Sequence, residues 1–191
     1  DNCVMDKFGR LGARKGRAQL TSSLGGTVTD DHIGIDLQGL SNFTDIKGVS
    51  TFISWSDTTF YKGTTALTEL PTSGADVTSP VVGNWQAATL NDKQFFFQRG
   101  YKPLCYEDLG GASTPSFTTV ATSSGFIGTP PSANTVLAAY GRLWAADEPL
   151  NKTKVSFTNV LEGNQWAGGT SGYIDISSVL TSGMDEIVAL G

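Results

Sequence analysis

The single histidine and the acidic pair before it are the first candidates for chemistry in this 191-residue sequence. His32 follows Asp30 and Asp31 in a polar stretch, so a serine or cysteine nucleophile would have to use this imidazole as its base. No nucleophile-elbow pattern surrounds it, and the two aspartates lack the alternating oxygen ligands of a calcium loop. Two cysteines and one histidine also lack the spacing of a zinc site. We therefore predict no catalytic residues, no metal and no cofactor.

A second candidate is the segment 156–166, which resembles the Ser-x-Asp-x-Gly-x-x-Trp turn of propeller glycosidases. Two residues are inserted before Gly163, and Asn159 stands one place late for the aspartate. In those enzymes the turn is a folding element away from the active site, so we expect Trp166 to anchor a core and Asn159 and Gly163 to form the turn. The catalytic set of such an enzyme includes several arginines, and beyond the first 17 residues this chain has two, Arg99 and Arg142.

Aromatic residues could form a binding platform, but at strand spacing they are more often core residues. We expect the core assignment for Phe95, Phe96, Phe97, Tyr140, Trp144 and Trp166.

Positive charge is concentrated at the start of the chain. The first 17 residues carry a net charge of +3 within a chain of −5, so the remainder carries −8. An acidic body disfavours broad, non-specific binding of nucleic acid, which needs clustered lysine and arginine. The basic segment is either a solvated hairpin or a contact with DNA or with an acidic neighbour; its candidate contact residues are Lys7, Arg10, Arg14, Lys15 and Arg17.

The elements that position these residues are three antiparallel meanders. The clearest joins residues 135–139 and 142–146 through a Tyr140-Gly141 turn, in which Gly141 supplies the positive φ of a tight hairpin. Its apolar residues do not alternate with polar ones, so both faces should be covered. A polar loop that begins at Asp147 then leads to a third strand, 154–158. The other meanders are predicted at 49–55, 58–61 and 64–68, and at 85–90, 93–98 and 101–106.

Aligning the turns at Asp57, Asp92 and Gly141 gives spacings of 35 and 49 residues, which is typical of β-propeller blades. We predict an all-β fold of antiparallel meanders, as blades of a β-propeller or, alternatively, as a Greek-key sandwich. Residues 1–45 are assigned to an amino-terminal hairpin and linker, and 46–191 to an incomplete set of blades within a larger chain. The final residues, 186–191, resemble the middle of a strand.

Composition fits this fold, since 39% of the residues are hydrophobic and only 16% are charged. Cys3 and Cys105 are too few for a disulfide framework, and we expect free, buried thiols in a protein assembled in the cytoplasm.

The chain resembles the nozzle proteins, or tail tubular proteins B, of short-tailed, T7-like bacteriophages. The resemblance is strongest from about residue 135 onward, and the opening is similar to the start of the same proteins, where a strand and a basic hairpin precede the first blade. The segments that carry it are 2–16, 137–147, 151–163, 173–178 and 184–190.

This resemblance implies a structural protein of the virion, without enzymatic activity and without a small-molecule substrate. It implies a homohexameric ring in the phage tail, below the adaptor ring and near the tail fibres, assembled in the host cytoplasm. Viral DNA would pass through its channel during ejection without sequence-specific binding. The alternative is a propeller-type protein that binds or cleaves glycans, and an intracellular adaptor propeller is a third possibility.

Overall fold

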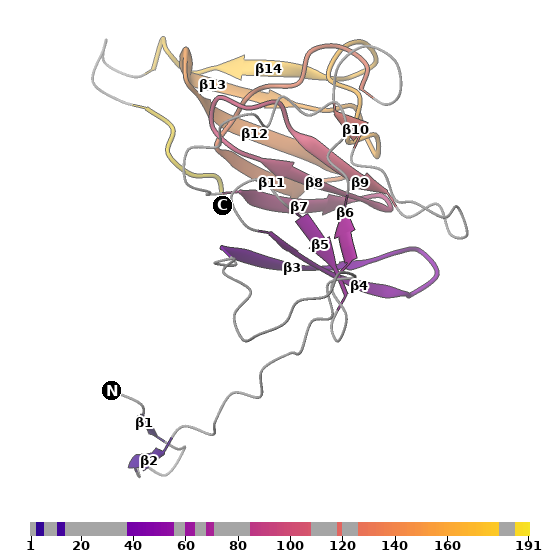
Figure 1. The fold of residues 1–191 in the computed structure, drawn as a ribbon. Helices are drawn as coiled ribbons and strands as arrows, with labels where there is room; N and C mark the ends of the chain where they lie inside the picture. Colours follow the sequence, from indigo (N-terminus) through magenta and orange to yellow (C-terminus); the bar gives the residue numbers. More distant parts are fainter. Residues whose placement is uncertain are drawn as a thin grey trace.

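The computed structural model of the chain describes residues 3–5, 11–13, 38–55, 60–63, 68–70, 85–107, 118–119, 126–179 and 186–191; within 3–5, 11–13 and 118–119 only the backbone is described. The described chain is all-β (Figure 1). β1 (Cys3–Met5) and β2 (Leu11–Ala13) form an antiparallel pair, which confirms the two amino-terminal strands. The remaining strands form three four-stranded antiparallel sheets.

Each of these sheets is a meander in which strands adjacent in sequence are also paired. Sheet 1 contains β3 (Gly39–Thr44), β4 (Ser50–Trp55), β5 (Phe60–Lys62) and β6 (Thr68–Leu70). Sheet 2 contains β7 (Gln86–Leu90), β8 (Lys93–Phe97), β9 (Leu104–Glu107) and β10 (Thr118–Thr119). Sheet 3 contains β11 (Thr135–Ala139), β12 (Arg142–Glu148), β13 (Asn151–Phe157) and β14 (Gly172–Asp175).

The three sheets are stacked in chain order (Figure 1). One apolar core lies on each side of sheet 2. The run Phe95, Phe96 and Phe97 explains the arrangement, because successive strand residues point to opposite faces. Phe96 packs into the core shared with sheet 1, where its ring centroid lies 5.0 Å from that of Phe60. Phe95 and Phe97 pack into the core shared with sheet 3, and all three rings are fully buried. Sheet 2 is therefore covered on both faces.

Two-residue turns connect the central hairpins as predicted. Asn91 and Asp92 have φ of 47° and 63°, and Tyr140 and Gly141 have φ of 53° and 69°. Positive φ at both central positions is the mark of a type I′ turn, whose twist matches that of the paired strands. The Asn91-Asp92 turn also contacts sheet 1, since the Asp92 carboxylate accepts a hydrogen bond from the Ile46 amide in the turn between β3 and β4.

Several strand boundaries differ from the prediction. β3 pairs with β4 along its whole length, so sheet 1 begins at Gly39, within the segment assigned to the linker. The predicted strand 101–106 starts only at Leu104, because Pro103 has no N–H for the ladder. The predicted strand 64–68 is displaced to β6, which places Leu70 in the core at 2% exposure.

The third meander shows a further difference. The predicted polar loop after Ala146 is a turn of two residues, Pro149 and Leu150, and β13 begins three residues earlier than expected. The cause is a β-bulge at Asp147, whose φ of 64° allows Glu148 to pair with Asn151.

Two further expectations differ from the structure, one for residues 186–191 and one for the covering of the third meander. Residues 186–191 are not a strand; the amide of Ile187 donates to the carbonyl of Lys152 at 2.9 Å without extending the sheet. Both faces are covered at β12, where Leu143, Ala145 and Ala146 are buried, but not at β11. β11 lies at the edge of its sheet, and its residues are half-buried or exposed.

Candidate functional site

The predicted contact residues of the basic segment, Lys7, Arg10, Arg14, Lys15 and Arg17, lie outside the described residues, and so do Asp30, Asp31 and His32. Within the described part of the chain, no group of three or more histidine, cysteine, aspartate or glutamate side chains could hold a metal ion. The described residues also include no helix with the length and apolar character needed to cross a membrane.

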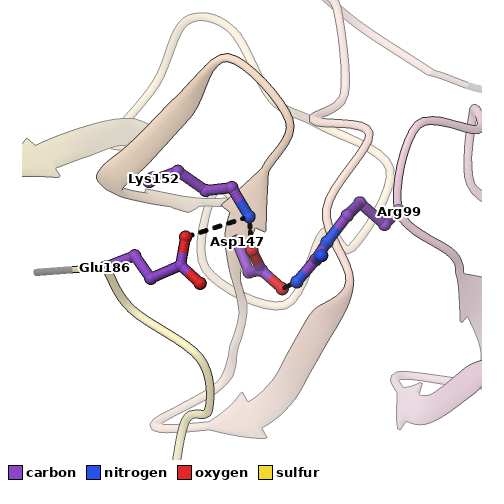
Figure 2. Close-up of polar contacts among 4 residues, drawn as sticks. All are labelled: Arg99, Asp147, Lys152 and Glu186. Carbon is purple, nitrogen blue, oxygen red and sulfur yellow. Dashed lines mark hydrogen bonds and ion pairs between the residues drawn. The ribbon is translucent and has the colours of Figure 1, made fainter.

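Asp147 is a charged residue whose side chain is fully buried. Figure 2 shows its contacts with Arg99 and Lys152. Its carboxylate lies between Arg99, from the turn after β8, and Lys152, near the start of β13. Arg99 donates a hydrogen bond to Oδ2, and the Lys152 Nζ lies 2.6 Å from Oδ1. Lys152 also pairs with Glu186 at 3.4 Å. Asp147 therefore connects sheet 2, sheet 3 and the segment that ends the chain.

Local structure explains why an aspartate occupies this position. The bulge requires a left-handed backbone conformation, which aspartate and asparagine adopt more readily than most residues. Burial alone would raise the pKa of Asp147, but the hydrogen bonds from Arg99, Lys152 and Asn134 outweigh it and hold the pKa below its usual range. The hydrogen bond with Asp147 in turn raises the pKa of Lys152. The group is thus charged at neutral pH and serves as a clamp between elements.

Beside this clamp lies a cavity of about 470 Å³. Its floor is formed by β13 and β14, and its walls by residues 129–132, by the turn at 148–151 and by Trp166. On the floor, the Lys154 Nζ lies 4.0 Å from the Glu148 carboxylate and 4.7 Å from the centroid of the Tyr173 ring. The Ser156 hydroxyl donates to Glu148 at 3.3 Å. Polar and aromatic groups therefore converge on one concave surface.

The turn that resembles a glycosidase folding element has the predicted structural role. The Asn159 amide group donates to Glu162 at 2.7 Å and to Gln165 at 3.0 Å, and its oxygen accepts from the Thr170 hydroxyl at 2.7 Å. Trp166 is 9% exposed and packs edge-to-face against Phe97. Trp166 is thus a core anchor, as predicted, and it also lines the cavity.

Gly163 of the same turn packs tightly. A Cβ at this position would approach the Phe95 ring to 2.6 Å. A side chain here would therefore have to displace a fully buried ring.

The arginines and aromatic residues beyond the amino-terminal segment also have structural roles. Arg142 donates to the carbonyl oxygens of Thr158 and Thr170 at 2.5 and 2.8 Å, and its guanidinium lies 5.3 Å from the centroid of Phe157. Trp144 is half-buried, and its ring packs 5.1 Å from Phe157. Tyr140 differs from the prediction because it is 92% exposed at the tip of its hairpin.

Cys105 is a free, buried thiol, as predicted, and burial raises its pKa to about 12. It is therefore an unreactive core residue at neutral pH. Cys3 lies in β1, and its side chain is outside the described part of the structure.

The sequence did not single out Asp147 or, apart from Trp166, the residues of the cavity. The polar run after Ala146 has the composition of a loop, which concealed both the bulge and the continuing strand. A detectable signal was the position of Asp147 directly after four apolar residues of a strand, where a charged side chain must either find partners or leave the sheet.

Comparisons with protein-family models, with curated proteins and with solved structures find no match to this chain.

Proposed function

We propose that this protein is a structural component of a short, non-contractile phage tail, in which it contributes to a ring-shaped nozzle for the passage of DNA. It acts through assembly and not through catalysis. In this proposal the three stacked sheets are consecutive blades of a β-propeller, and copies of the protein form a homohexamer in the virion, below the adaptor ring and near the tail fibres.

The observation that carries the proposal is the structural use of the residues on which the resemblance rests. Tyr140-Gly141 forms the hairpin turn, Arg142 joins β12 to the segment after β13, and Asp147 connects sheets 2 and 3. Lys152 extends the same connection to Glu186. Residues used in this way as contacts within the fold are what a scaffold requires, because its role depends on keeping its shape.

The distribution of charge supports a conduit. The chain beyond residue 17 carries a net charge of −8, and like charge reduces adhesion of the DNA backbone to a surface. DNA that must slide through a channel benefits from such a wall. The basic segment with Lys7, Arg10, Arg14, Lys15 and Arg17 is then the part suited to touch DNA or an acidic neighbouring protein.

The decisive experiment is the particle mass of the protein purified from assembled virions, measured by light scattering and by single-particle imaging at physiological salt. The proposal predicts a closed ring of about six copies. A monomer under these conditions contradicts it.

A second measurement tests conduction. A fluorescent 30-base-pair duplex is titrated with the ring at about 150 mM and at about 20 mM salt. We expect no tight binding at the higher salt and weak, sequence-independent binding at the lower. A variant with glutamine at the five basic positions should lose the weak binding. Tight binding at physiological salt would contradict a channel through which DNA slides.

A further inference from the structure

The cavity on sheet 3 has the dimensions of a ligand site. Its volume of about 470 Å³ lies within the roughly 300–1,000 Å³ typical of small-molecule pockets. The floor of the cavity consists of the paired strands β13 and β14. Its wall includes the turn of Pro149 and Leu150, and this turn is flanked by Asp147 and Lys152 of the buried clamp. The shape is therefore held by the fold.

The charges in the cavity favour an uncharged ligand. Glu148 and Lys154 are the charged residues among those that line it, and they lie within 4.0 Å of one another. Their side chains are only 14% and 30% exposed. An anionic ligand would meet Glu148 and a cationic one Lys154, and each would have to compete with an existing ion pair. A neutral ligand can hydrogen-bond to both without separating them.

The remaining groups favour a ligand with hydroxyl groups around an apolar ring. Glu148 offers acceptors, Lys154 offers donors, and Ser156 offers both. Apolar surface comes from Tyr173, which is 63% exposed, and from Pro149, which is also exposed. A pyranose combines these features, because its hydroxyls both donate and accept while its C–H faces pack on aromatic and proline rings.

We propose that this cavity binds a neutral saccharide of one or two rings. The proposal concerns binding and not cleavage: glycoside hydrolysis commonly uses two carboxylates, and Glu148 is the one carboxylate among the described lining residues. The site goes beyond the proposed tail function and does not depend on it, since every residue named belongs to one copy of the chain.

The test uses the intact protein and a panel of named sugars. Ligand-observed saturation-transfer NMR is recorded with methyl glucoside, methyl galactoside, N-acetylglucosamine, maltose and chitobiose. N-acetylneuraminic acid and glucosamine serve as anionic and cationic probes, and affinities of positive cases are measured by calorimetry. We expect at least one neutral sugar to bind more tightly than both charged ones. Absence of binding by every neutral sugar at about 10 mM, or tighter binding of a charged one, would overturn the proposal.

Two variants and one matched control locate the binding. Tyr173→Ala removes an exposed ring from the floor and should weaken the neutral sugar about tenfold. Tyr140→Asn removes an exposed ring outside the cavity and should leave affinity unchanged. Glu148→Gln retains an acceptor for Ser156 but removes the carboxylate that pairs with Lys154, so it should weaken the neutral sugar about fivefold and improve binding of N-acetylneuraminic acid. Unchanged affinity in both cavity variants would refute the site, whatever the particle mass.

Discussion

Replacement of Asp147 by asparagine tests whether the buried carboxylate stabilises the stacked sheets. Asparagine nearly matches the shape of aspartate and also tolerates the left-handed conformation at φ 64°, so the variant isolates the charge. The desolvation of a buried carboxylate opposes its attraction to two cations, and replacing a buried ion pair by a neutral group is neutral in some proteins. At Asp147 the hydrogen bonds prevail in lowering the pKa, which predicts that the charged form stabilises the fold.

The magnitude follows from the contacts that are lost. Two hydrogen bonds to a charged group contribute about 1.5–3 kcal/mol each. Arg99 and Lys152 are 46% and 28% exposed and regain water when the carboxylate is removed, which reduces the net loss. We therefore expect the free energy of unfolding to fall by about 2–4 kcal/mol for Asp147→Asn. For a chain of this length that corresponds to a Tm lower by about 5–15 °C.

The assay is thermal and urea unfolding at several pH values, with Asp175→Asn as control. Asp175 is an exposed carboxylate that accepts from Thr153 and Ser177, and an asparagine oxygen can accept both bonds. The control should change Tm by less than about 2 °C. If Asp147→Asn is as stable as the wild type at pH 7 or above, the desolvation of the carboxylate cancels its attraction to Arg99 and Lys152. That result would refute the reasoning.

The pH dependence adds an independent signature. The pKa of Asp147 is lower in the folded state than in the unfolded state. The contribution of its carboxylate to the free energy of unfolding is therefore complete above the unfolded-state pKa of about 3.9, and it is lost as the pH falls through the folded-state pKa. The difference between wild type and Asp147→Asn should therefore shrink in acid. The pKa of Lys152 is raised in the folded state. The contribution of its charged form to the stability of the fold is therefore present below about pH 10.4 and disappears as the pH rises through the folded-state pKa.

Three further changes test separate parts of the fold. In a Cys3→Ser variant, Cys105 of the folded protein should react with a maleimide at pH 8 roughly a thousandfold more slowly than in protein unfolded with urea, because burial raises its pKa to about 12. Equal rates in the two states would contradict the burial of this thiol. Gly163→Ala should cost about 1–3 kcal/mol in urea unfolding, since its Cβ would meet Phe95, whereas Gly191→Ala, with open space around it, should have no effect. Tyr140→Asn should raise the free energy of unfolding by about 0.5–1 kcal/mol, measured as a higher Tm, because asparagine adopts the positive φ of this position more readily than tyrosine. A lower Tm would contradict this expectation, since a ring that is 92% exposed has little packing to lose.

The sequence predicted the features that depend on neighbouring residues. Consecutive apolar residues at 95–97 indicate a strand covered on both faces, and the structure buries Phe96 against sheet 1 and its neighbours against sheet 3. The Asn91-Asp92 and Tyr140-Gly141 turns were likewise predictable, because positive φ is favoured by particular residue types.

The features that depend on distant residues were not predictable in this way. β3, the fourth strand of sheet 1, was taken for linker, because its pairing with β4 is not visible in its own residues. Asp147 reads as a loop residue until Arg99, 48 positions earlier, is known to face it. Such a pairing is a property of the packed sheets and has no local pattern.

The clamp and the cavity meet at the turn of Pro149 and Leu150, and this placement separates the residues that stabilise the fold from those that line the cavity. Asp147 and Lys152 flank the turn and lie in the network that joins sheets 2 and 3, so changes there act on the whole fold. Tyr173 lies on the edge strand and is 63% exposed, so its loss should spare the stability of the sheet and act on the cavity alone. Buried charges can in this way hold the sheets together while exposed residues remain free for the proposed ligand, because the two roles use different residues of sheet 3.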